Sequence, residues 1–151
     1  RTHFIHQDLI GVWHLNLLCS NNDTTFYRND INAGFKTSLI HKRKDLDSIE
    51  INTLINESFE KLKKINLKII NDTFALITKM KSGRNNLQID DYDTLNYSVI
   101  DTIIELDFKS KNNFGQKMRL KKDNNILRFD SKEKETMPNG NHIQIEFIKL
   151  D

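Results

Sequence analysis

The chain has 151 residues and a mass of 17.8 kDa, the size of one domain, so residues 1–151 are expected to fold as a single unit. Its 23 Lys and Arg residues nearly balance 21 Asp and Glu residues, and the net charge of +2 gives no reason to expect a nucleic-acid partner. The sequence contains no run of about 18 apolar residues, which a membrane-spanning helix would need. The single cysteine excludes an internal disulfide and a cysteine-rich zinc site.

The first apolar segment covers residues 9–19. At a period of two, Trp13, Leu15 and Leu17 share one face, while the polar Asn16 lies on the other. The segment superficially resembles the apolar part of a lipoprotein signal, but polar side chains interrupt it, so we predict a buried first strand. The sequence begins at Arg1 and not at Met, as expected for a trimmed or processed chain.

The next part of the chain has weaker patterns. Residues 21–30 are rich in Asn, Asp and Thr, which favour turns because their side chains bond the nearby backbone. A second strand is predicted near 35–40, followed by a basic run at 41–44 that is typical of a solvated face.

Residues 47–65 contain the one clear helical pattern. Asp47 or Ser48 could cap this helix, with Glu50 completing a capping box. The first turns also suit a strand, because β-branched and polar residues alternate there, and we predict a helix over roughly 52–64. One apolar stripe recurs at spacings of three and four: Ile51, Leu54, Ile55, Phe59, Leu62 and Ile65.

From residue 67 onward apolar and polar residues alternate at a period of two. Residues 67–78 predict a hairpin that turns at Asn71-Asp72. Such alternation is typical of antiparallel strands with one buried face. It recurs in four later segments, at 95–99, 104–108, 117–121 and 143–149.

The connectors at 100–102, 122–125 and 138–141 are short and rich in turn-forming residues. Short connectors join antiparallel neighbours, so this part of the chain is predicted to be a meander of hairpins. Closing the first strand against the last one, at 142–150, would remove both exposed edges. The sequence therefore predicts a mainly β fold, a small antiparallel up-and-down β-barrel with one helix.

The Gly11-x-Trp13 opening before a meander resembles lipocalins, and the layout resembles the lipocalin-like domains of bacterial cell-envelope proteins. The early helix departs from lipocalins, which carry their main helix after the last strand. The fatty-acid-binding proteins, with helices after the first strand, are therefore an alternative template. The resemblance implies export to the periplasm, the cell envelope or the medium, with a cytoplasmic location as the alternative.

The resemblance also implies non-enzymatic binding of a small hydrophobic or amphipathic molecule in a barrel cavity, without a cofactor. Gly11 and Trp13 would form the barrel floor beneath Arg128, with Arg119 as the competing arginine. The inward candidates for ligand binding, which continue the face of Trp13 and Leu15, are Phe74, Leu76, Tyr97, Ile104, Leu106, Met118, Leu120, Phe129, Ile145 and Phe147.

Two other functions remain open. If the same side chains fill the barrel, the protein would be an interaction module, such as an inhibitor or immunity-type partner. Its contact face would be the helix, residues 21–46 or the loop at 130–141. An enzyme would need titratable groups inside, and the alternation places four candidates outside: Glu105, Asp107, Glu146 and Lys149.

Other candidate sites lack a supporting pattern. His3 and His6 have no third metal ligand at a matching spacing, and Cys19 has no catalytic motif around it. The acidic residues 90–93 lack the calcium-loop pattern, so no metal is expected. Acidic residues interleave the basic segments at 61–64 and 117–122, which are predicted to be solvated faces.

Overall fold

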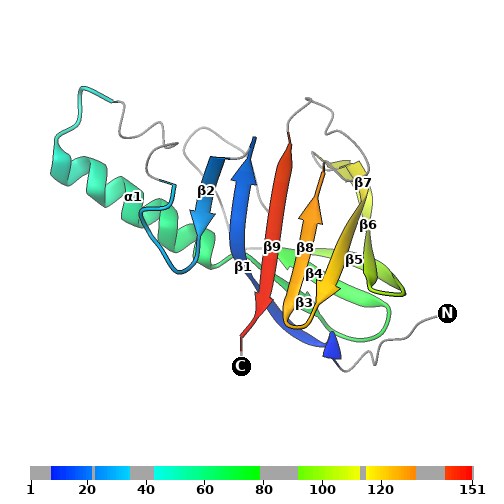
Figure 1. The fold of residues 1–151 in the computed structure, drawn as a ribbon. Helices are drawn as coiled ribbons and strands as arrows, with labels where there is room; N and C mark the ends of the chain where they lie inside the picture. The colour runs from blue at the N-terminus through cyan, green and yellow to red at the C-terminus, as the bar shows by residue number, and fades with distance from the viewer. Residues whose placement is uncertain are drawn as a thin grey trace.

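The computed structural model describes residues 8–21, 23–34, 43–78, 92–112, 115–131 and 142–150, with the backbone alone at 109–112 and 115–116. This part of the chain contains nine strands and one helix (Figure 1). In chain order they are β1 (Gly11–Ser20), β2 (Asp23–Tyr27), α1 (Ser48–Lys63), β3 (Asn66–Ile69), β4 (Phe74–Thr78), β5 (Tyr92–Ile100), β6 (Ile103–Asn112), β7 (Gly115–Asp123), β8 (Ile126–Asp130) and β9 (Ile143–Lys149).

The strands form a closed antiparallel barrel. From β3 to β9 each strand pairs with the next along the chain, and β1 pairs with β3 on one edge and with β9 on the other. Trp13 lies opposite Lys149, and Leu15 lies opposite Phe147. The ring therefore has no open edge, because the first and last strands satisfy each other's backbone groups. The predicted up-and-down barrel, closed by these two strands, is confirmed.

A β-bulge at Asn16 reverses the alternation along β1. The pairing with β9 shifts there, so Leu17 lies opposite Glu146 on the outer face and Leu18 faces the interior. The prediction that Leu17 shares a face with Trp13 is therefore wrong. The period of the sequence pattern does not by itself reveal where a bulge inserts an extra residue into a strand.

The turn predicted over residues 21–30 is also partly wrong, because β2 occupies its middle. β2 pairs with the second half of β1, next to β3, and this pairing overrides the weak strand preference of Asp and Thr. Phe26 of β2 is 2% exposed and packs against Phe59 of α1, with the ring centroids 5.3 Å apart. The strand predicted near 35–40 lies outside the described residues.

The helix begins four residues earlier than the predicted 52–64. Asp47 is its N-cap: a side-chain oxygen of Asp47 accepts from the Glu50 N–H at 2.8 Å, and the Glu50 carboxylate accepts from the Asp47 N–H at 3.3 Å. This reciprocal capping box stabilises the first turn despite its β-branched residues. No residue of α1 is fully buried, and Figure 1 shows the helix beside β2, outside the ring of strands.

The two ends of the barrel differ. The connections at 70–73, 101–102 and 124–125 are short, and they lie at the end where β1 begins and β9 ends. Asp101 and Asn124 lie in two of the predicted turns and have φ values of 54° and 53°. Asp and Asn tolerate this left-handed conformation better than most residues. We call this the closed end. The opposite end, where β4, β6 and β8 finish, is called the loop end; the turn predicted at 138–141 lies outside the described residues.

Candidate ligand site in the barrel

The closed end is plugged by a small group of side chains from the first and last strands. Leu9 and Trp13 are fully buried, and the indole Nε1–H of Trp13 donates to the Leu9 carbonyl at 2.8 Å. The ammonium of Lys149 lies 5.8 Å from the centre of the Trp13 ring. It donates to the backbone carbonyls of Asp8 and Ile10 at 3.2 and 2.8 Å. This end of the barrel is therefore sealed.

The cation at the tryptophan is Lys149 and not an arginine. Arg128 lies on the outer face with 52% of its side chain exposed, where its guanidinium pairs with Glu146 at 3.2 Å. Arg119 is outside too, paired with Glu105 at 2.8 Å. The assignment of Arg128 to the floor is wrong, and so is the outward placement of Lys149. Residues directly opposite in an antiparallel pair share a face, and Lys149 is opposite the inward Trp13.

Gly11 lies at the same end. Its φ of 136° is a backbone conformation that side chains disfavour, and an added Cβ would come within 2.9 Å of the Lys149 Cε. The φ angle therefore favours glycine here, and a side chain would also displace the flexible end of Lys149.

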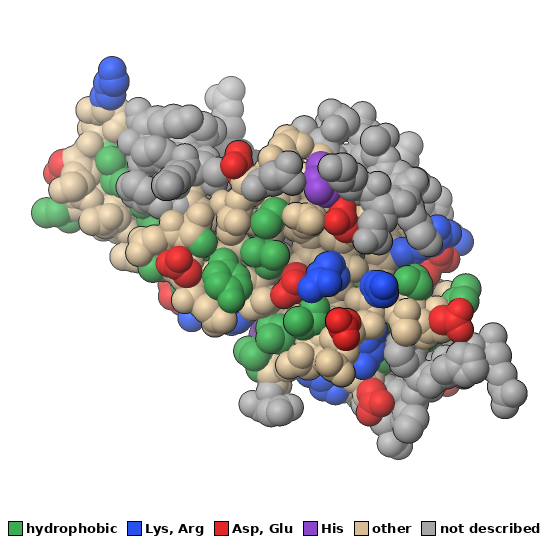
Figure 2. Space-filling model, in the orientation of Figure 1, with side chains coloured by type: hydrophobic (Ala, Val, Ile, Leu, Met, Phe, Trp, Pro, Cys, Tyr) green, Lys and Arg blue, Asp and Glu red, His purple; other side chains and the backbone are tan. Residues whose placement is uncertain are grey.

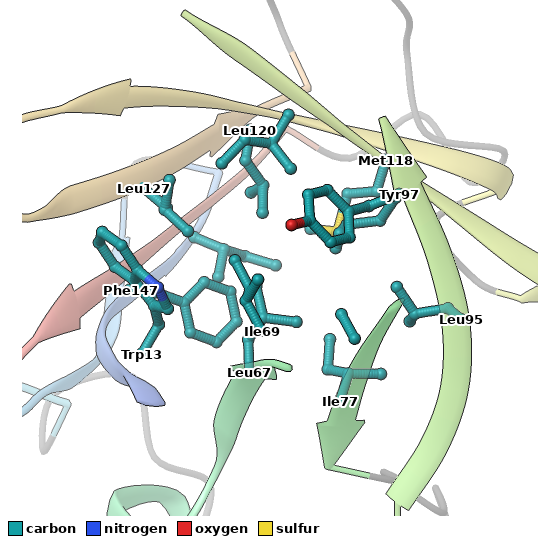
Figure 3. Close-up of a cluster of buried hydrophobic side chains, with 14 of the residues drawn as sticks. Trp13, Leu67, Ile69, Ile77, Leu95, Tyr97, Met118, Leu120, Leu127 and Phe147 are labelled. Atoms are coloured by element: carbon teal, nitrogen blue, oxygen red, sulfur yellow. The ribbon is translucent and has the colours of Figure 1, made fainter. Parts of the chain in front are cut away.

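Most of the predicted lining residues do face the interior. Figure 3 shows side chains from β1, β3, β4, β5, β7, β8 and β9 pointing toward one another. Of the predicted set, Phe129 is half-buried, and seven residues are buried: Tyr97, Ile104, Leu106, Met118, Leu120, Ile145 and Phe147.

The prediction is wrong on β4. Phe74 and Leu76 are half-buried on the outer face, whereas Ala75 and Ile77 are buried inside. Ala75 lies opposite the inward Leu95, which determines the register. Residues 74–77 are all apolar, so the alternation of apolar and polar residues could not show which of them face inward. Sequence reasoning also missed the buried Leu67, Ile69, Leu95 and Leu127 as lining residues.

The hydroxyl of Tyr97 is hydrogen-bonded to the backbone of the protein itself. The phenol O–H donates to the backbone carbonyl of Asn71, in the β3–β4 connection at the closed end. Burial raises the pKa of Tyr97, with a further contribution from the charge of Asp72. The Tyr97 hydroxyl is therefore a neutral, satisfied donor that anchors a turn.

The inner face is more open toward the loop end on one side. Leu18, Phe129 and Ile143 lie on the inner faces of β1, β8 and β9, where they are half-buried and pack against the buried core. Beneath them along β9, Ile145 and Phe147 are 5% and 3% exposed. These three side chains form an apolar surface that the core does not fully cover; we call it the upper apolar face.

A polar cluster lies on the outer face of the same strands, at the end of β8 and the start of β9, because Asp130 and Gln144 are opposite each other and alternate with the inward Phe129 and Ile145. The imidazole Nε2 of His142 is 2.7 Å from a carboxylate oxygen of Asp130, and the Gln144 amide donates to the other oxygen at 3.1 Å. The His142 N–H donates to the Asn21 side chain at 2.9 Å, joining β9 to the end of β1.

The three acidic residues predicted to lie outside, Glu105, Asp107 and Glu146, are on the outer face of the barrel. Glu105 pairs with Lys117 at 3.4 Å and with Arg119, and these hydrogen bonds lower its pKa. Glu146 also accepts from the Asn16 amide at 2.8 Å, and Asp107 is exposed. Within the described ranges, no three His, Cys, Asp or Glu side chains gather as a metal site would need. His3 and His6 lie outside those ranges.

His14 carries a testable pH dependence. It is half-buried on the outer face of β1, and burial, together with the charge of Arg28, lowers its pKa. A histidine in an unfolded chain has a pKa of about 6.5. The unfolded chain therefore binds this proton at a higher pH than the folded chain does. The free energy of unfolding should therefore decrease as the pH falls through this range.

We expect His14→Gln to reduce this decrease, as measured by urea unfolding from pH 8 to pH 5. Equal pH slopes for the two chains would show that His14 does not contribute. The comparison is between slopes, so any constant effect of the substitution on stability cancels.

Three comparisons with known proteins found no relative: no family model, no curated protein and no solved structure matches this chain. Among the described residues, the helix is neither long nor apolar enough to cross a membrane. The geometry of the barrel is therefore what bears on function.

Proposed function

We propose that the protein is a lipocalin-like binding protein that holds a small hydrophobic or amphipathic molecule, without catalysis, in the loop-end half of its barrel. The closed eight-strand ring supports this proposal, since a ring of this size is just wide enough for one small ligand. So does the Gly11-x-Trp13 opening, whose tryptophan lies at the sealed end. The same resemblance supports a place in the cell envelope or outside the cell.

The upper apolar face is the observation that carries the proposal. Leu18, Phe129 and Ile143 face inward yet keep part of their surface accessible. Apolar surface left open beside a packed core gains about 25 cal/mol for each Å² that a ligand covers. Ligand affinity would come from this burial.

The first test is native mass spectrometry of gently purified protein, together with displacement of a fluorescent fatty-acid probe. The key variant is Ile143→Trp, which enlarges an inward side chain on the upper apolar face and should weaken probe binding at least tenfold. Trp also suits a strand, so the barrel should persist.

The matched control is Thr94→Trp, which adds the same side chain to an exposed position of β5. Probe binding by this variant should stay within about twofold of the original chain. If the unmodified protein carries no bound molecule and does not bind the probe, the barrel is filled and the ligand-carrier function is wrong.

A further inference from the structure

The outer face of the barrel loses its polar character at the closed end. Along β1, β3, β8 and β9, six aliphatic side chains occupy outward or terminal positions there, although strand alternation would place polar residues at such positions. Ile10, Ile70 and Leu150 are 39%, 45% and 49% exposed. The half-buried members are Val12, Ile126 and Ile148. We call these six residues the closed-end patch.

The pairing of the strands makes the patch continuous. Gly11 lies opposite Ile69, so the exposed Ile10 and Ile70 follow side by side from β1 and β3. Ile126 lies directly opposite Ile148, next to the end of β9. In Figure 2, hydrophobic side chains gather at the lower end of this face, near the C-terminal end of β9, with both acidic and basic side chains beside them.

Farther along the same strands the outer face is charged. Arg128 pairs with Glu146 on β8 and β9, and Arg119 pairs with Glu105 on β7 and β6. Along β8 and β9 the aliphatic outer surface is thus confined to the closed end. Contiguous exposed apolar patches with polar borders mark sites of interaction in soluble proteins.

The exposed charges at the border of the patch are acidic, whereas the half-buried Lys68, opposite Val12, holds its ammonium 4.6 Å from the centre of the Tyr92 ring. Asp8, Asp72 and Asp123 are exposed, and none of them forms an ion pair within the part of the chain that the structure describes. The ammonium of Lys149 at this end donates to backbone carbonyls, and that of Lys122 donates to the Asn124 carbonyl. The nearest exposed cation on β7, Lys121, lies one step farther from this end, opposite Arg128.

We propose that the closed-end patch binds another protein, through a surface whose aliphatic side chains are flanked by Lys or Arg. The aliphatic core of the patch would supply the buried area, and the aspartates would select the basic flanks. A second copy of this chain fits less well, because it would bring the three aspartates of each molecule together. The same charges repel an anionic lipid surface.

The test uses the full chain and a synthetic amphipathic peptide of Leu and Lys, labelled for fluorescence anisotropy. Binding should be at least tenfold tighter than for the matching Leu and Glu peptide, and it should weaken as salt is added. A double variant, Ile70→Ser with Leu150→Ser, should weaken binding of the Leu and Lys peptide at least tenfold. Asp72→Asn with Asp123→Asn should weaken it by about threefold or more.

Ile49→Ser is the matched control, because Ile49 is 76% exposed on α1, away from the barrel end. It should leave peptide binding within about twofold. Three outcomes would overturn the proposal: equal binding of both peptides, self-association that the double variant abolishes, or binding to phosphatidylglycerol vesicles in place of the peptide. Each can be read whether or not the barrel carries a ligand.

Discussion

Trp13→Ala is expected to lower the free energy of unfolding by about 3–5 kcal/mol, the usual cost of deleting a buried aromatic side chain. Trp13 is fully buried at the closed end, between Leu9 below it and the lining residues above it. Its removal would leave a cavity, an unsatisfied Leu9 carbonyl and a Lys149 ammonium without its ring. Total stabilities are about 5–15 kcal/mol, so this loss should be plain in urea unfolding.

Trp13→Phe separates these contributions. It retains an apolar ring but loses the Nε1–H donor, and we expect a smaller loss of about 1–2 kcal/mol. Ile100→Ala, at an exposed position of the β5–β6 hairpin, should change stability by less than about 0.5 kcal/mol. A cost below about 1 kcal/mol for Trp13→Ala would show that the closed end is not tightly packed.

Arg28→Met is expected to cost about 2–3 kcal/mol and to loosen the helix in particular. The guanidinium of Arg28 donates to the Leu15 carbonyl of β1 at 2.9 Å and to the Lys63 carbonyl at the end of α1 at 2.7 Å. A cation at a helix C-terminus also interacts favourably with the helix dipole. Phe59 and Leu62 pack α1 against the core, and this link adds a polar attachment at the end of the helix.

Two measurements distinguish this role from a general loss of stability. The substitution should increase the rate of amide hydrogen exchange more in α1 and at Ile65 than in β4 to β8. The pKa of His14 should rise in the variant, since the charge of Arg28 is one cause of its lowering. Arg43→Met, which removes an exposed arginine paired only locally with Asp45, should have an effect below about 0.5 kcal/mol. Unchanged exchange in α1 would contradict the anchoring role.

Local patterns were enough to predict much of the barrel. The period-two segments of β5, β6, β7 and β9 have the inner faces that the alternation indicates, and the Asp47 capping box begins the helix. Each of these features depends on residues close together in the sequence. Tyr97, Leu106 and Phe147 of the predicted lining face inward as expected, and their role in ligand binding stays a prediction.

Pairing between distant segments decided the rest. β2 is a strand because it pairs with β1, and the Asn16 bulge exists only relative to β9. The inner face of β4 is set by its neighbours, since each residue from Phe74 to Ile77 is apolar.

By itself, the sequence determined the alternating strands, the helix cap and the tryptophan near the start of a meander. The tertiary structure alone decided that Lys149 and not Arg128 lies at that tryptophan, and that six aliphatic side chains meet at the closed end. The physical reason is that periodicity reports which side of one strand is buried. The residue that lies opposite on the next strand depends on register, which bulges and ring closure set across more than a hundred residues.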